Sequence, residues 1–242
     1  MRPSIRSATP LAAVLSFAAC APRPQPPADS PAVTMSASSA DRAPSGAWRP
    51  LFDGRSLAGW RGFRQTAPPD GWVVRDGLLA RVASGGDLMT VEQFGDFELE
   101  LEWRVQPGGN SGIIYRISGE GENTYESGLE MQVLDDAAHR DGKDPLTSAG
   151  ALYGLYPAPR GVVKPAGEWN TARVVARGMH VEHWLNGQKV VDAEMWSPEF
   201  RERHARSKFT QWPAYAKATR GHIALQDHGD LVEYRNVRIR ER

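Results

Sequence analysis

One short stretch places a carboxylate and an amide where they could act on a substrate together. In LEMQVLDD (residues 129–136) the apolar residues alternate as the buried face of a strand, so Glu130 and Gln132 project from the opposite face. Asp135 follows at the strand end, where a bulge or the end of the strand must orient it. Such groups can transfer protons and bind polar ligands, although a solvated surface strand would show the same pattern.

A second stretch, GHIALQDHGD (residues 221–230), puts Gln226, Asp227 and His228 at the end of an apolar strand. Histidine titrates in the range that suits proton transfer at neutral pH. Neighbours on an extended strand point in opposite directions, so Asp227 and His228 can share the rim of a groove only if the strand bends there. The alternative is a hydrogen-bonded corner that closes the fold.

A third stretch, PGGNSGIIYR (residues 107–116), supplies Asn110 and Arg116. Its glycines permit a tight, closely approaching backbone. Alternation predicts that Arg116 faces away from its apolar neighbours, and we expect Glu130 and Gln132 to lie near Arg116 and Gln226. An arginine beside Glu130 would be either a structural ion pair or a clamp for an anion or an oxygen atom.

The segment 139–157 has little periodicity and is long for a connection, which is typical of a functional loop. It contains His139, which by itself is more typical of a solvated loop residue. Tyr153 in this segment and Trp184 further along could serve as core residues or as stacking platforms for sugars.

Strict alternation of apolar and polar residues predicts the strands that would position these groups. FELELEWRV (97–105) is the clearest case, and its acidic row is expected to be a solvated outer face. Asn186-Gly187 is a strong hairpin signal, and one helix is predicted from Ser197 as N-cap with Pro198 in the first turn. Many short strands, glycine-rich turns and one short helix predict an all-β sandwich or jelly roll. Further strands are expected at 112–118, 128–134, 171–177, 179–187, 221–227 and 231–240, the last with a bulge.

The N-terminal residues differ in composition from the rest of the 242-residue chain. Residues 1–20 resemble a bacterial lipoprotein signal peptide, with an apolar stretch that ends in FAAC at Cys20, the only cysteine. Residues 21–47 are rich in Pro, Ala and Ser, as expected of a disordered tether, and the folded domain is expected at 48–242. These features predict lipidation at Cys20 and a lipid-anchored envelope protein of the outer membrane or periplasm.

The composition limits the partners of the protein. The formal net charge is +0, which gives no reason to expect a nucleic acid or an anionic membrane surface as partner. Contact with a membrane is therefore expected through the lipid anchor only. A single cysteine also means that no disulfide can form within one chain.

An ordered set of motifs across residues 49–241 resembles the family known as DUF1080 or the 3-keto-disaccharide hydrolase domain. The motifs include LFDGRSLAGW, FGDFELELEWRV, GGNSGIIYR, YESGLEMQVLDD, GALYGLYP, GEWNTARVV, HWLNG and GHIALQDHGDLVEYRNVRI. The resemblance implies a concanavalin A-like jelly roll. It also implies an enzyme that cleaves 3-keto-glycosides, sugars already oxidised at C3 by a partner dehydrogenase.

A ketone at C3 acidifies the C2 proton, so a base can remove it, the group on C1 can leave, and water can add afterwards. This chemistry does not need the paired carboxylates of ordinary glycosidases, which agrees with Gln132 at a position where similar β-glucanase strands carry an acid. We expect His228 or Glu130 to transfer the proton, and Arg116 with Gln132, or a bound divalent cation, to hold the enolate. No ligand spacing indicates a particular metal. The other candidates are Asp135 and Asp227 for catalysis and Asn110, His139, Tyr153, Trp184 and Gln226 for substrate binding.

Two other interpretations remain open on the sequence. A non-catalytic, lectin-like carbohydrate-binding protein would use the same fold, with Trp184, Tyr153 and Arg116 as its main residues. A structural envelope lipoprotein would need no groove.

Overall fold

A computed structural model describes residues 46–241 of the chain. The expected signal peptide, Cys20 and nearly all of the expected tether lie outside the described residues. No helix within residues 46–241 is long and apolar enough to cross a membrane.

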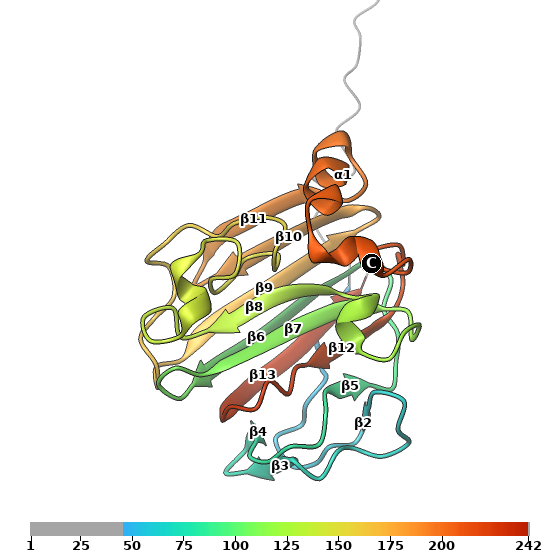
Figure 1. Ribbon diagram of the computed structural model, residues 1–242. Helices are drawn as coiled ribbons and strands as arrows, with labels where there is room; N and C mark the ends of the chain where they lie inside the picture. Colours follow the sequence, from blue (N-terminus) through green and yellow to red (C-terminus); the bar gives the residue numbers. More distant parts are fainter. Residues whose placement is uncertain (1–45, 242) are drawn as a thin grey trace, which may run out of the picture. The chain divides into compact units, whose positions relative to one another are not determined.

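Two antiparallel sheets stack face to face in this part of the chain (Figure 1), so the prediction of an all-β jelly roll is confirmed. The eight-stranded sheet has the order β11-β10-β9-β6-β13-β4-β3, with β1 also paired to β13. Its strands are β1 (Arg49–Pro50), β3 (Trp72–Arg75), β4 (Leu78–Arg81), β6 (Phe97–Val105), β9 (Asn170–Arg177), β10 (His180–Leu185), β11 (Gln188–Glu194) and β13 (Val232–Glu241).

The five-stranded sheet carries the candidate site and has the order β2-β5-β12-β7-β8. Its strands are β2 (Trp60–Gly62), β5 (Leu88–Thr90), β7 (Asn110–Ile117), β8 (Leu129–Leu134) and β12 (His222–Leu225). The short helices are α1 (Pro198–Ala205) and the 3₁₀ turns η2 (Thr124–Glu126), η3 (Arg140–Lys143) and η4 (Lys208–Gln211). Every strand that the sequence predicted is present, together with short N-terminal strands that are too brief for alternation to reveal.

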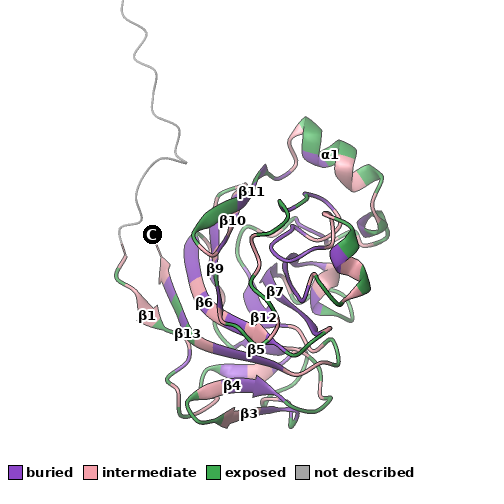
Figure 2. Ribbon diagram, turned by 90° about the vertical axis from the view of Figure 1, so that its left-hand side faces the viewer, coloured by how far each residue is buried: buried purple, intermediate pink, exposed green. Residues whose placement is uncertain are grey.

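The main core lies between the sheets, where strands such as β6 and β9 are largely buried (Figure 2). In β6 the alternating apolar residues from Phe97 to Val105 face inward, as predicted. A smaller apolar cluster covers the other face of the five-stranded sheet and contains Met89, Ile114, Ile117 and Ala224, with Phe63 and Tyr125 packed against it. Residues of the loops and short helices, such as Phe63 and Tyr125, therefore pack on this face of the five-stranded sheet.

The acidic row of β6 is more ordered than the solvated surface that its sequence predicted. Glu98 is only 3% exposed and pairs with Arg240 (2.6 Å) and Arg177 (2.8 Å). Further along, Glu100 pairs with Arg238 and Glu102 with Arg235. Arginines of the neighbouring strands β13 and β9 thus form ion pairs with each glutamate of this row. The sequence of β6 alone does not reveal this cross-strand pairing.

Several local predictions are confirmed by backbone geometry. Asn186 and Gly187 both have positive φ (50° and 81°), as a tight hairpin turn requires. The bulge predicted in the last strand lies between Arg235 and Arg238. Ser197 caps α1, because its side chain accepts a hydrogen bond from Phe200 N at 3.1 Å.

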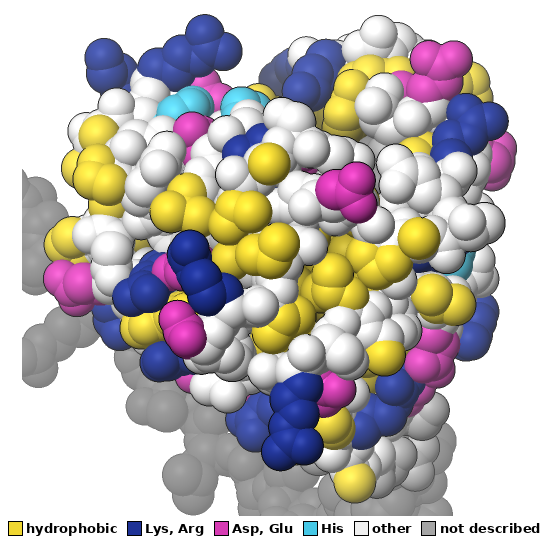
Figure 3. Space-filling view, turned by 90° about the horizontal axis from the view of Figure 1, so that it is seen from below, with side chains coloured by type: hydrophobic (Ala, Val, Ile, Leu, Met, Phe, Trp, Pro, Cys, Tyr) yellow, Lys and Arg dark blue, Asp and Glu magenta, His cyan; other side chains and the backbone are white. Residues whose placement is uncertain are grey.

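Basic and acidic side chains mix with hydrophobic ones on the face of the molecule seen from below (Figure 3). This surface agrees with the balanced charge of the chain.

Candidate active site

Two cavities lie on the face of the five-stranded sheet that points away from the other sheet. The first, here the Glu130 cavity, has a volume of about 270 Å³ and the second, the Asp87 cavity, about 310 Å³. They meet at Tyr125, Gln226 and His228, which line both. The Glu130 cavity is otherwise lined by Asn110, Glu130, Gln132, Tyr153, Lys208, Phe209 and Trp212.

Glu130 on β8 is a buried carboxyl group, only 8% exposed. Its side chain lies over Gly112 of β7, and a Cβ atom at position 112 would be 2.3 Å from Glu130 Oε1. Burial raises the pKa of Glu130 to about 8, while the Lys208 ammonium group lowers it, the Asp87 carboxyl raises it and a hydrogen bond from Gln226 lowers it. Glu130 can therefore exchange a proton near neutral pH.

Three amide side chains that line the Glu130 cavity have buried oxygen atoms. Within the described part of the chain, no donor reaches the buried side-chain oxygens of Asn110, Gln132 and Gln226. Their nitrogens are engaged, since Gln132 donates to Thr147 O (3.1 Å), Asn110 Nδ2 lies 3.3 Å from His228 Nε2, and Gln226 bonds Glu130. Buried acceptors without donors are costly, so this cavity is suited to a ligand rich in hydroxyl groups.

Two histidines stand together at the edge of the groove. His228 is exposed, and its ring centroid lies 6.3 Å from that of His139. His139 caps η3, because its Nδ1 accepts a hydrogen bond from Asp141 N at 3.1 Å. The structure thus brings His139, which sequence alone favoured as a solvated loop residue, next to the main histidine candidate.

The positive charge at the site comes from Lys208, which the sequence analysis did not identify. It is the one lysine or arginine among the described residues that line the Glu130 cavity. Its Nζ lies 4.6 Å from the centroid of the Tyr153 ring. No periodic signal pointed to Lys208, because η4 is a short 3₁₀ turn brought over the sheet by the chain after α1.

Arg116 forms no ion pair with Glu130 and lines neither cavity, although it lies only two residues along β7 from Ile114, the residue paired with Glu130. The register between β7 and β12 shifts at this point: Ile117 pairs with His222 and Tyr115 with Ile223, and Arg116, with φ of 58°, is the extra residue. Arg116 is 1% exposed, and its closest carboxylate is Asp96 Oδ1, 3.9 Å away. The bulge breaks the alternation on which the prediction relied.

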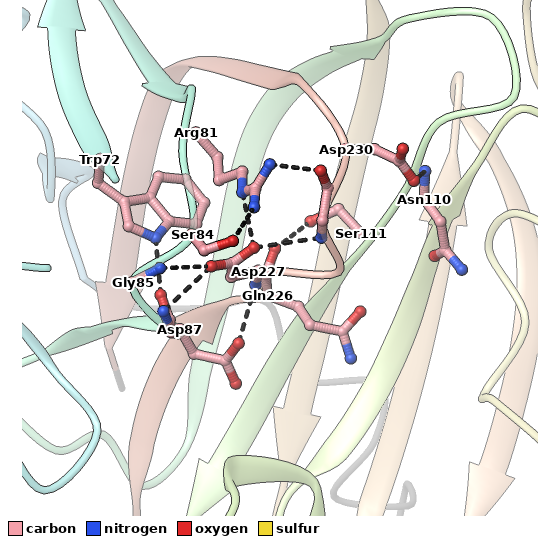
Figure 4. A network of polar contacts seen from close by, with 12 residues as sticks. Trp72, Arg81, Ser84, Gly85, Asp87, Asn110, Ser111, Gln226, Asp227 and Asp230 are labelled. Carbon is pink, nitrogen blue, oxygen red and sulfur yellow. Dashed lines mark hydrogen bonds and ion pairs between the residues drawn. The ribbon is translucent and has the colours of Figure 1, made fainter. Parts of the chain in front are cut away.

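Asp227 and Asp135 anchor loops. Asp227 Oδ1 pairs with Arg81 Nε (2.6 Å), and its Oδ2 accepts hydrogen bonds from the backbone of Gly85 and Gly86 (Figure 4). Asp135 accepts from Gly108 N (2.8 Å) and Ala137 N (3.1 Å). These contacts favour the alternative of a hydrogen-bonded corner at Asp227, and they use both carboxylates within the protein.

Of the two aromatic candidates, only Tyr153 lies at the groove. Its backbone N donates to Glu130 O at 3.0 Å, and its ring lines the cavity. Trp184 lies outside both cavities, on the outer face of β10, where its Nε1 donates to Glu182 and the Arg173 guanidinium covers its ring. Tyr125, Phe209 and Trp212 also line the Glu130 cavity and were missed by the sequence analysis. The ring centroids of Tyr125 and Trp212 lie 5.4 Å apart.

One cluster in residues 46–241 has the spacing of metal ligands, and it lies away from the groove. It consists of His180, Glu182 and Asp192 on β10 and β11. The Lys189 ammonium group already contacts Glu182 (3.3 Å) and Asp192 (2.5 Å), which supplies the positive charge there.

The chain is similar in sequence and in fold to several known proteins. A 3-keto-disaccharide hydrolase of Bacteroides thetaiotaomicron is 35% identical, and the match covers 78% of this chain and 77% of that protein. A solved structure of a candidate glycosyl hydrolase from Parabacteroides distasonis has a TM-score of 0.75 at 30% identity, covering 81% of this chain and 94% of that one. A Bacillus subtilis protein with a galectin-like fold shares the fold, with a TM-score of 0.53 at 13% identity over 81% of this chain and 94% of that one.

The jelly roll with its polar, aromatic-walled groove defines a carbohydrate-active protein of the hydrolase and lyase class. The family model of the 3-keto-alpha-glucoside-1,2-lyase-like domain matches residues 47–240, and the chain belongs to that family. The resemblance seen in the sequence motifs is thereby confirmed.

Proposed function

We propose that this protein cleaves 3-keto-glycosides in the groove by elimination followed by hydration. The observation that carries the proposal is Glu130, a buried carboxyl group with a pKa of about 8 beside three amide oxygens for which the described residues supply no donor. Sugar hydroxyl groups would supply those donors and hold the ring. A carboxyl group with this pKa suits proton removal from the carbon next to a ketone.

The reaction begins when ionised Glu130 takes the C2 proton of the sugar. The negative charge moves to the C3 oxygen, where Lys208 stabilises the enolate, the role that the sequence analysis gave to Arg116. The bond between C1 and its substituent then breaks, and the leaving oxygen takes a proton from His228 at the junction of the cavities. Water finally adds across C1 and C2, with its oxygen on C1 and a proton returned to C2, so the net reaction is hydrolysis.

Binding of a divalent cation stays a prediction. The carboxyl group of Glu130 and the free amide oxygens of Asn110, Gln132 and Gln226 are the oxygen ligands that Ca²⁺ and Mg²⁺ prefer. Such an ion would supply further positive charge for the enolate.

The test is incubation with a 3-keto-glucoside, with the same glucoside not oxidised at C3 as the matched control. We expect release of the leaving group from the 3-keto compound only. Glu130→Gln should lower the rate by about 10²- to 10⁴-fold, the range for loss of a general acid or base. Tight binding of the control sugar without turnover of the 3-keto compound would instead favour a lectin-like protein.

Lipid attachment at Cys20 and a place in the outer membrane or periplasm are part of the same proposal. They rest on the signal-like residues 1–20 and the Pro-, Ala- and Ser-rich residues that follow.

A further inference from the structure

We propose that the Asp87 cavity receives the leaving group and selects against a negatively charged one, so that the natural substrates release a neutral or amino sugar. This inference rests on the function proposed above. It adds the chemical class of the group attached to C1.

The position of the Asp87 cavity follows from where the proton is removed. Glu130 lines only the Glu130 cavity, so the ring that loses its C2 proton must lie there. C1 adjoins C2, and the bond that breaks therefore points toward a neighbouring space. The two cavities meet at Tyr125, Gln226 and His228, so the leaving group extends past these residues into the Asp87 cavity.

The size of the Asp87 cavity suits one sugar ring. Its volume of about 310 Å³ is at the lower end of the range for small-molecule sites. Phe63 provides an apolar wall, while Gln65 and Asn123 offer amide groups to hydroxyls. An aromatic ring beside polar side chains is a common arrangement for a hydroxylated ring with one apolar face.

The charge of the Asp87 cavity is negative. Asp87, Asp227 and Glu122 line it, and no lysine or arginine of the described chain does. Asp227 is paired with Arg81 and burial raises the pKa of Asp87, so exposed Glu122 carries the uncompensated charge. Asp87 is held in place, since its Oδ1 accepts a hydrogen bond from Asp227 N (2.8 Å) and Thr124 Oγ1 donates to its Oδ2. A uronate or a sugar phosphate would meet the Glu122 carboxylate without a cation among the residues that line the cavity, whereas an ammonium group would be attracted.

The Glu130 cavity has the opposite arrangement, because Lys208 faces a carboxyl group whose raised pKa leaves it largely neutral at pH 7. The two cavities therefore differ in charge as well as in position. The ring with the developing enolate meets the cation, and the departing sugar meets the Glu122 carboxylate.

The experiment compares three 3-keto-glucosides of the same linkage whose leaving groups are glucose, glucosamine and glucuronate. We expect kcat/KM for the glucuronate compound to be at least about tenfold below that for the glucose compound. The kcat/KM for the glucosamine compound should equal or exceed that for the glucose compound.

Variants at Glu122 connect this selectivity to the cavity. Glu122 is exposed, so Glu122→Gln and Glu122→Lys should fold normally. The ratio of kcat/KM for the glucose compound to kcat/KM for the glucuronate compound should fall by about two- to fivefold in Glu122→Gln. It should fall further in Glu122→Lys. Glu120→Gln, an exposed charge change outside both cavities, is the matched control and should leave the ratio unchanged.

Methyl 3-keto-glucoside separates this inference from the proposed function. It lacks a leaving-group ring, so the Glu122 variants should change its turnover less than they change the turnover of the glucuronate compound. Equal kcat/KM for all three sugars, or a ratio that Glu122→Lys does not alter, would overturn the charge selection while leaving the cleavage reaction intact. Absence of turnover for every compound would overturn both.

Discussion

Glu130, the base in the proposed reaction, carries a cost in stability. Its pKa is raised from 4.5 to about 8, so the folded protein holds this proton more tightly than the unfolded chain does. The stabilisation from that proton is fully present below about pH 4.5 and is lost as the pH rises through about 8. Above that pH the fold contains a buried carboxylate that forms no ion pair with any residue from 46 to 241.

Glu130→Gln should therefore stabilise the protein at high pH. We expect its melting temperature to exceed that of the wild type by several °C near pH 9, and to match it within about 1 °C near pH 4.5. Thermal unfolding of both proteins across this pH range measures the difference. A constant difference at all pH values would show that Glu130 does not titrate in the buried state described here.

Gly112 should be required for the position of the Glu130 side chain. A Cβ atom in Gly112→Ala would lie 2.3 Å from Glu130 Oε1, so the carboxyl group must move away. We expect activity to fall by about 10- to 100-fold, because the proposed base would be misplaced. The stability cost should be about 1–3 kcal/mol, as for other overpacked sites.

Gly95→Ala is the matched control for the change at Gly112. Its nearest neighbour would be Arg220 Nη1 at 3.7 Å, an ordinary contact, and its φ is not positive. Activity close to that of the wild type in Gly112→Ala would contradict the placement of Glu130.

At the scale of the elements, the sequence predicted strands better than it predicted irregularities within them. Alternation in β6 and β8 correctly gave the inward and outward residues, including Glu130 and Gln132 at the groove. Alternation failed at Arg116, because a bulge in β7 inserts this residue as an extra one and shifts the in-and-out pattern of the strand. The bulge arises from the pairing of β7 with β12, which the sequence of β7 alone does not show. Lys208 and Trp212 could not be predicted, since only the tertiary fold brings the segment after α1 over the sheet.

The turn between β12 and β13 depends on Asp227 for its structure. Asp227→Asn removes the charge that pairs with Arg81, and both side chains are about 6% exposed. We expect a loss of about 3–5 kcal/mol in the free energy of unfolding, the usual cost of leaving one buried charge unpaired. Urea denaturation measures it.

The activity of the Asp227→Asn variant separates a structural role from a catalytic one. If it remains folded at low temperature, its kcat should stay within about tenfold of the wild type, because the Asp227 carboxylate is engaged by Arg81, Gly85 and Gly86. A fully stable variant with kcat reduced by about 10³-fold would instead assign Asp227 to the chemistry.

At the scale of the whole molecule, the proposal gives different roles to residues 46–241 and to the N-terminal residues. The groove is contained within residues 46–241, while Cys20 and the residues around it determine where the protein resides in the proposal made above. The balanced charge of the chain offers no electrostatic attraction to membranes.

Cys20→Ser should therefore release the protein from membranes without changing its activity. Fractionation of cells that express the wild type and the variant measures the distribution, with kcat of the solubilised proteins as a control. A variant that still fractionates with membranes would contradict lipid attachment at Cys20.

Exchange of the C2 hydrogen with solvent deuterium tests the central claim most directly. With a 3-keto-glucoside in D₂O, the wild type should catalyse exchange at C2, and the rate should rise with pH to a plateau above about 8, because Glu130 must be ionised to act as the base. Glu130→Gln should abolish this pH-dependent exchange. Cleavage without incorporation of deuterium at C2, or exchange that persists unchanged in Glu130→Gln, would contradict the account.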